Sequence, residues 1–86
     1  MDFEYDRNKS DANKEKHGID FEEAQALWLD ENRAVVRTRC VSERRDLVIG
    51  RIGGVYWTAV VTSRGDAIRI ISVRRSRKTE KDIYDG

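Results

Sequence analysis

The densest group of side chains that could carry out chemistry lies close to the C-terminal end of the sequence. Five cationic residues fall within a short segment there: Arg69, Arg74, Arg75, Arg77 and Lys78. A planar guanidinium group binds phosphate through two parallel hydrogen bonds, so a groove lined by arginines suits an RNA phosphate. Ion pairs with acidic helices are the alternative interpretation. Strand alternation predicts that Arg69 and Arg75 share one face of a strand, whereas Arg74 lies on the other.

Proton transfer would need a second group of side chains. His17 is the only histidine, so any acid–base step that uses an imidazole must use this residue. Its place at the end of a predicted helix is equally typical of a cation that stabilises the helix dipole. Glu80 and Tyr84 lie one helical turn apart on one face, where they could transfer protons or pack. Arg64 lies on the predicted turn before the last strand, at the opposite end of that strand from Arg74.

The formal net charge of +1 hides an uneven distribution of charge along the sequence. Residues 1–32 hold four basic and ten acidic residues, a net charge of −6. Residues 33–78 hold twelve basic residues, eleven of them arginine, and three acidic ones, a net charge of +9. Such a split predicts a basic surface on the second part of the chain that suits a polyanion. The alternative is a sheet whose arginine-rich face pairs with the acidic first part.

The sequence contains no motif typical of a metal or cofactor site. Cys40 is the only cysteine, which excludes an intrachain disulfide and a zinc site of the usual Cys/His type. A glycine-rich phosphate loop, a nucleophile elbow and a dinucleotide fingerprint are all absent, so we expect no cofactor. No apolar run approaches the roughly 20 residues that span a bilayer, so we expect no membrane association, and a lone thiol fits a cytoplasmic protein. Cleavage of RNA by its own 2′-hydroxyl group suits such a chain, because the protein only has to orient the reactants, move protons and stabilise charge.

Local capping signals predict helices at both ends of the chain. Asp6 and Gly18 bound a first, almost wholly polar helix that ends near His17 and should face mostly solvent. A capping box of Asp20 and Glu23 begins a second helix. The buried face of that second helix is predicted to carry Phe21, Ala24, Leu27 and Trp28. A final helix, capped by Ser76, is predicted to hold Glu80, Ile83 and Tyr84 on one face.

Between these helices the apolar residues alternate with a period of two. Strands are predicted over residues 34–38, 47–52, 55–62 and 67–73, with turns at Gly53-Gly54 and at residues 63–66. Residues 3–5 could add a short edge strand. The predicted fold is therefore an α+β domain over residues 1–86, with two N-terminal helices, a four-stranded antiparallel sheet and a C-terminal helix.

Several blocks of the sequence together resemble the BrnT toxin family. They are residues 3–6 (FEYD), 13–24 (NKEKHGIDFEEA), 49–50 (IG), 62–66 (TSRGD) and 68–75 (IRIISVRR), followed by Glu80 and Tyr84. The resemblance spans nearly the whole chain. It implies a fold similar to the RelE-type ribonuclease toxins and RNA cleavage that arrests translation. It also implies a BrnA antitoxin with a ribbon-helix-helix DNA-binding part, through which the complex would contact operator DNA.

Carried onto the matching positions, the resemblance also implies functional residues. The predicted catalytic residues are His17, Arg64, Arg69, Arg74, Arg75, Glu80 and Tyr84, and the predicted RNA-binding residues are Lys16, Arg77 and Lys78. We therefore predict a type II toxin that is a metal-independent endoribonuclease neutralised by a BrnA-type antitoxin. A non-catalytic module that binds RNA or an antitoxin through the same basic surface is one alternative. A structural or regulatory subunit whose arginines serve an acidic protein partner is the other. The general acid and base stay open at this point.

Overall fold

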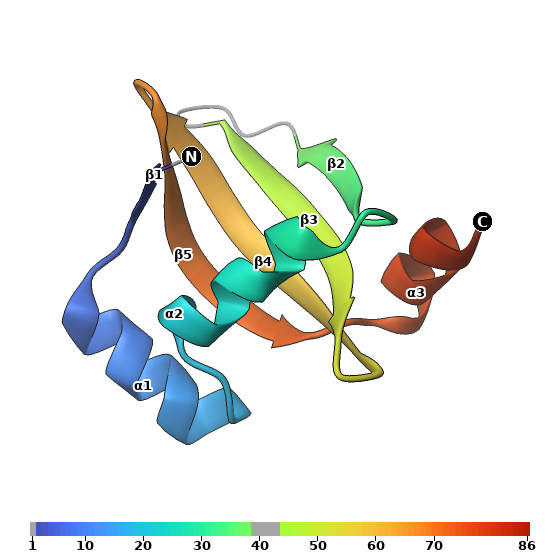
Figure 1. Cartoon of the computed structure of the whole chain (residues 1–86), viewed down its shortest axis with the longest axis horizontal. Coiled ribbons are helices and arrows are strands. Elements are labelled where there is room, and N and C mark those ends of the chain that lie inside the picture. Colours follow the sequence, from blue (N-terminus) through green and yellow to red (C-terminus); the bar gives the residue numbers. More distant parts are fainter. Residues whose placement is uncertain (1, 39–43) are drawn as a thin grey trace.

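A five-stranded sheet with helices on both faces forms the structure, which is a computed structural model that describes residues 2–38 and 44–86. Its elements in chain order are β1 (Asp2–Glu4), α1 (Arg7–His17), α2 (Phe21–Ala24), the 3₁₀ segment η1 (Gln25–Leu29), β2 (Ala34–Thr38), β3 (Arg45–Ile52), β4 (Val55–Arg64), β5 (Ala67–Arg75) and α3 (Lys78–Asp85) (Figure 1). The strand order is β1-β5-β4-β3-β2. Cys40 lies outside the described residues.

The predicted α+β class is confirmed, but the sheet is not purely antiparallel and has a fifth strand. β2 to β5 form the predicted antiparallel meander, whereas β1 pairs with β5 in parallel, with Phe3 opposite Ile68. The aromatic rings of Phe3 and Trp28 pack edge to face with centroids 4.8 Å apart, which holds β1 in place. This pairing joins segments from the two ends of the chain, so no local pattern could have predicted its direction.

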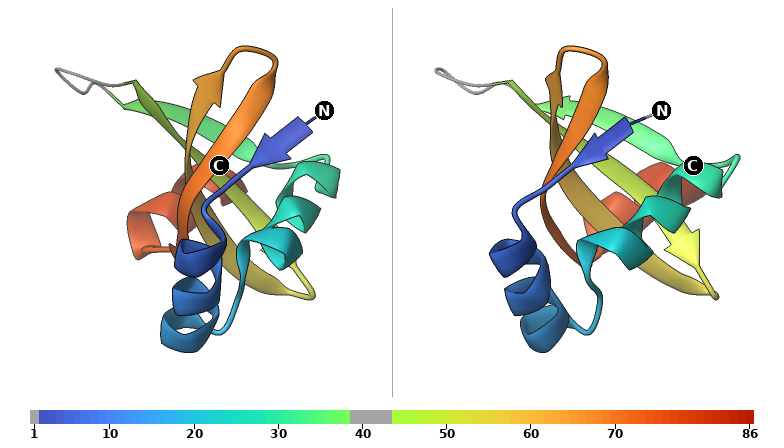
Figure 2. Two further views of the ribbon diagram at one scale, coloured as in Figure 1. Left: turned by 90° about the vertical axis from the view of Figure 1, so that its left-hand side faces the viewer. Right: turned by 60° about the vertical axis from the view of Figure 1, so that its left-hand side comes forward.

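Helices cover the two faces of the sheet unequally. Figure 2 shows α1, α2 and η1 on one side of the sheet and α3 on the other. The main core lies under the N-terminal helices and consists of Ile19, Phe21, Ala24, Leu27, Val48, Trp57, Ala59, Val61, Ile70 and Val73. On the side of α3, Ile49 and Thr58 are fully buried. Among the described residues, no helix is long and apolar enough to span a membrane.

The predicted caps of the first two helices are confirmed. The Asp6 carboxylate accepts the backbone N–H groups of Asn8 and Lys9, and Gly18 ends α1 in the left-handed conformation with a φ of 84°. The capping box of Asp20 and Glu23 begins α2. The second helix is not a single α-helix as predicted, because after one turn it tightens into the 3₁₀ segment.

Two buried polar side chains attach the almost wholly polar α1 to α2 and to the sheet. The amide group of Asn13 donates to the carbonyl oxygens of Ile19 at 2.8 Å and Val73 at 2.9 Å, and its oxygen accepts the N–H of Val73 at 3.3 Å. Ser10 accepts the N–H of Phe21. α1 therefore docks by satisfying backbone groups of its neighbours rather than by an apolar face, which the hydrophobic pattern could not predict.

Replacing Asn13 with alanine is expected to lower the free energy of unfolding by about 2–3 kcal/mol, because buried backbone groups of Val73 would lose their partner. Urea unfolding followed by circular dichroism measures this loss. Asn8→Ala is the matched control, since Asn8 is exposed on the same helix and should change stability by less than about 0.5 kcal/mol. Equal losses in both variants would contradict the docking role of Asn13.

A β-bulge in β5 changes which side chains share a face. Val60 pairs with Ser72 and Val61 with Ile70, so Ile71 is an extra residue and the alternation restarts after it. Arg69 and Arg74 consequently lie on the same face, opposite Thr62 and Thr58. The prediction that grouped Arg69 with Arg75 and placed Arg74 on the other face is wrong for this reason.

Two boundaries near the candidate residues also differ from the predictions. β4 continues through Arg64, so this arginine ends a strand and only the turn at Gly65-Asp66 follows it. Arg77, not Ser76, occupies the N-cap position of α3. The Ser76 hydroxyl group is instead buried and hydrogen-bonded to the Thr58 hydroxyl group at 2.7 Å.

Candidate active site

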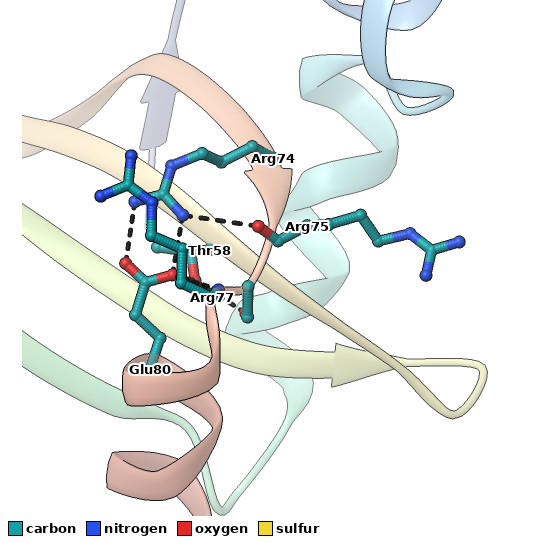
Figure 3. Close-up of polar contacts among 6 residues, drawn as sticks. Thr58, Arg74, Arg75, Arg77 and Glu80 are labelled. Carbon is teal, nitrogen blue, oxygen red and sulfur yellow. Dashed lines mark hydrogen bonds and ion pairs between the residues drawn. The ribbon is translucent and has the colours of Figure 1, made fainter.

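The junction between β5 and α3 holds an arginine and a carboxylate in a fixed arrangement. On the sheet face that α3 covers, Arg74 is the last residue of β5. Glu80 lies in the first turn of α3. The two terminal nitrogens of Arg74 donate to the two carboxylate oxygens of Glu80, Nη1 to Oε1 at 2.7 Å and Nη2 to Oε2 at 2.8 Å (Figure 3). This end-on, bidentate contact fixes the plane of the guanidinium group.

The Glu80 carboxylate is ionised, and both of its oxygens accept hydrogen bonds. Its Oε1 atom also accepts the Thr58 hydroxyl group at 3.1 Å and the backbone N–H of Arg77 at 2.8 Å. Hydrogen bonds from Arg74 above all lower the pKa of Glu80 to about 2, against an opposing effect of burial. The Glu80 side chain is only 7% exposed. A carboxylate with this pKa carries no proton at neutral pH, so it cannot act as a proton donor there.

Arg74 keeps one edge of its guanidinium group free. Its Nη1 atom makes a further, long contact of 3.4 Å with the carbonyl oxygen of Arg75, but its Nε atom makes no hydrogen bond within the described part of the chain. The edge formed by Nε and Nη2 is the one that grips an anion side-on. The Arg74 side chain is 23% exposed, so an anion from solvent can reach it. The pKa of Arg74 is raised by its hydrogen bonds to Glu80, which keeps it charged.

The other predicted proton-transfer residues are not brought to Arg74. The Tyr84 hydroxyl group donates to Asp30 at 2.7 Å, and the same carboxylate accepts the backbone N–H of Arg51 at 2.9 Å. The hydrogen bond to Asp30 raises the pKa of Tyr84. Glu80 and Tyr84 therefore contact different partners, although they lie one turn apart. His17 and Lys16 lie in the last turn of α1, in the helix layer opposite α3 (Figure 2).

The remaining predicted cations are dispersed over the molecule. Arg75 points away from Arg74 in Figure 3 and stacks over the ring of Trp57 at 5.4 Å. Arg69 lies on the same sheet face as Arg74 but near the start of β5, whereas Arg74 lies near its end. Arg64 is 3.6 Å from Glu4 at the far end of the sheet. Arg77 and Lys78 are both exposed at the start of α3.

Sequence reasoning missed Thr58, which is fully buried and links Glu80 to Ser76. The available signal was a polar residue inside the apolar run of β4, where a hydroxyl group requires a partner. Within residues 2–38 and 44–86, no three His, Cys, Asp or Glu side chains gather in a group that could hold a metal ion. The arrangement at Arg74 is suited to binding a phosphate and stabilising additional negative charge on it.

The comparison with protein families decides the identity of the chain. The model described as ribonuclease toxin, BrnT, of type II toxin-antitoxin system matches residues 5–80. The chain belongs to the BrnT family. The resemblance read from the sequence blocks is thus confirmed, and the BrnT match includes Arg74 and Glu80 but ends before Tyr84. No curated protein shows a significant match to this BrnT chain.

Proposed function

We propose that this BrnT-family chain is a metal-independent endoribonuclease that inhibits translation by cleaving RNA. The free edge of Arg74, fixed from behind by Glu80, is the observation that carries the proposal. A fold and activity like those of RelE-type toxins belong to the same proposal. Membership of a type II toxin-antitoxin family implies an antitoxin partner. We propose that the partner is of the BrnA type, and that its ribbon-helix-helix part contacts operator DNA for the complex.

The proposed reaction is an internal transesterification of RNA. The 2′-oxygen of a ribose forms a bond to the adjacent phosphorus, its proton goes to solvent, and the bond from phosphorus to the 5′-oxygen breaks. The products are a 2′,3′-cyclic phosphate and a released 5′-oxygen, which takes up a proton from solvent and becomes a 5′-hydroxyl group. Arg74 grips the non-bridging oxygens side-on, and its charge stabilises the extra negative charge of the pentacoordinate state.

The other residues take supporting parts in this proposal. Glu80 is a positioning residue that orients Arg74, since its pKa of about 2 leaves it without a proton to give. Arg77 and Lys78, exposed at the start of α3, bind flanking phosphates together with Arg69, which lies on the same sheet face as Arg74. His17, Lys16 and Arg64 lie away from this face, and we assign them no step at the phosphate that Arg74 holds.

An exposed apolar area supports the presence of a protein partner. Leu29 is 82% exposed and lines, with Phe3 and Trp28, a shallow surface cavity of about 570 Å³. Apolar patches of this kind mark contacts with other proteins. Growth arrest on expression of the toxin alone, and its reversal by the antitoxin, would accord with this partnership.

RNA cleavage in the presence of EDTA tests the proposed function directly. Purified toxin should cleave a long RNA with excess EDTA and leave a cyclic phosphate, because the nucleophile is the substrate's own hydroxyl group. An otherwise identical RNA with a 2′-deoxyribose at the cleaved position should stay intact there. RNA binding by folded toxin without cleavage would overturn the enzymatic proposal in favour of a non-catalytic binding module.

Tyr84→Phe is expected to lower the temperature of thermal unfolding slightly, because it removes the hydrogen bond to Asp30. RNA cleavage at a temperature where the variant is folded should stay within about twofold of wild type, since the hydroxyl group does not reach Arg74. Thermal unfolding and initial cleavage rates measure the two effects. A loss of cleavage of 100-fold or more in folded protein would instead identify Tyr84 as a proton-transfer residue.

A further inference from the structure

A second cationic pocket lies on the other side of the β5–α3 junction from the Arg74 edge. It has a volume of about 230 Å³ and is lined by Gly54, Val55, Tyr56, Arg75, Ser76 and Lys81. The turn between β3 and β4, the segment after β5 and the first part of α3 thus meet around it. The pocket is smaller than the usual range for drug-sized ligands, about 300–1,000 Å³, so it suits a small group such as a phosphate.

Aromatic rings hold the cations of this pocket in place. The Arg75 guanidinium group stacks over Trp57 at 5.4 Å, and the Lys81 ammonium group lies over the ring of Tyr56 at 5.6 Å. The Arg51 guanidinium group lies over the same tyrosine at 5.1 Å. Neither Arg75 nor Lys81 forms an ion pair within the described residues.

Acidic groups only partly offset this charge. Asp85 accepts the hydroxyl hydrogen of Tyr56 at 2.8 Å, and Asp30 lies near Arg51, whose backbone N–H it accepts. Arg51, Arg75 and Lys81 therefore outnumber the carboxylates around Tyr56, and two of the three cations line the pocket itself. The aromatic contacts already restrict the side chains of Arg75 and Lys81, so these side chains lose less conformational entropy when an anion binds.

We propose that this pocket binds a backbone phosphate of the RNA substrate next to the phosphate held by Arg74, with Arg75 and Lys81 as its ligands. The inference rests on the proposed function, because it takes RNA as the anion. Continuity favours RNA over an acidic protein: Arg74 and Arg75 are consecutive, and the exposed Arg77 extends to the same side as Arg74 while Arg75 points to the other side (Figure 3). An RNA strand that passes around the end of β5 would contact Arg77 and Arg74 on one side and then Arg75 on the other.

The salt dependence of RNA binding tests the proposal without relying on cleavage. The probe is a 2′-O-methyl RNA oligonucleotide, which the toxin cannot cleave by transesterification, followed by fluorescence anisotropy at several salt concentrations. Each single-stranded phosphate contact contributes about −0.7 to the slope of log affinity against log salt. Arg75→Gln and Lys81→Gln should each make the slope shallower by about that amount and weaken binding roughly five- to tenfold at low salt.

Two controls separate the pocket from general charge effects. Lys9→Gln removes one exposed charge in the first turn of α1 and should leave the slope unchanged. Arg75→Lys keeps the charge and should keep most of the slope even if the contact with Trp57 weakens. Slopes for Arg75→Gln and Lys81→Gln equal to that of Lys9→Gln would overturn the proposal. So would loss of antitoxin binding with unchanged RNA binding, since the pocket would then receive an acidic protein segment.

The two proposals fail in different ways. Cleavage by wild-type toxin with no effect of the pocket variants on binding would reject the pocket and leave the ribonuclease in place. Binding that depends on Arg75 and Lys81 without cleavage of ordinary RNA would support the pocket and reject the proposed enzyme.

Discussion

Arg74→Ala is expected to reduce the rate of RNA cleavage about 100- to 1,000-fold, the usual loss when one charge-stabilising donor is removed from an active site. Arg74→Lys should restore only part of the activity, because an ammonium group lacks the second parallel donor that binds phosphate side-on. Single-turnover cleavage of a defined RNA with saturating toxin measures these losses. Arg37→Ala is the matched control, since Arg37 is exposed on the edge strand β2 and away from α3.

Removal of Arg74 also leaves the Glu80 carboxylate buried without its main partner, so a folding defect must be separated from a catalytic one. The double variant Arg74→Ala/Glu80→Gln removes that unpaired charge and should regain stability without regaining activity. Cleavage by this folded double variant at a rate near wild type would contradict the assignment of Arg74. Glu80→Gln alone should retain measurable cleavage, reduced about tenfold, because Arg74 keeps its charge but is oriented less firmly.

The Arg74–Glu80 pair is also expected to make stability depend on pH in the acid range. The folded-state pKa of Glu80 is about 2, below its ordinary value of 4.5, so folding favours the ionised form. The resulting stabilisation, on the order of 3 kcal/mol, is fully present above pH 4.5 and is lost as the pH falls from 4.5 to about 2. Urea unfolding at pH values between 7 and 2.5 measures the loss, and Glu80→Gln should flatten this part of the profile.

A double-mutant cycle isolates the pair from its surroundings. Arg74→Ala and Glu80→Ala are each expected to lower the free energy of unfolding by about 3–5 kcal/mol, because each leaves a partly or fully buried group unpaired. The double variant should lose clearly less than the sum, with a coupling energy of about 2–3 kcal/mol. Additive losses, or the same acid profile in wild type and Glu80→Gln, would show that the pair does not stabilise the fold.

Features that depend on a few neighbouring residues were predictable from the sequence. The caps at Asp6, Gly18 and Asp20 need only side-chain-to-backbone bonds or one backbone angle within a turn, and all three are present. The strand at residues 34–38 and the hairpin at Gly53-Gly54 follow from alternation and turn chemistry. Membership of the BrnT family could likewise be predicted, because the sequence blocks that resemble the family occur in order along the chain.

The grouping of the candidate residues was decided by the tertiary structure. Alternation along β5 predicted the wrong face for Arg74 relative to Arg69, because the bulge at Ile71 arises from the register with β4, which the sequence of β5 does not contain. Tyr84 shared a helix face with Glu80 in the sequence, yet its partner is Asp30, far away along the chain.

One physical reason separates the features that the sequence predicted from those that only the tertiary structure decided. Local hydrogen bonds and periodic burial depend on residues only a few positions apart. The sequence by itself therefore determined the caps of the first two helices, the strands of the meander and the number of arginines available to the site. Strand register, the parallel pairing of β1 and the partners of buried charges depend on segments that meet only after folding. The tertiary structure therefore decided that Arg74 faces Glu80 with one edge free, and that Arg75 turns to the opposite side.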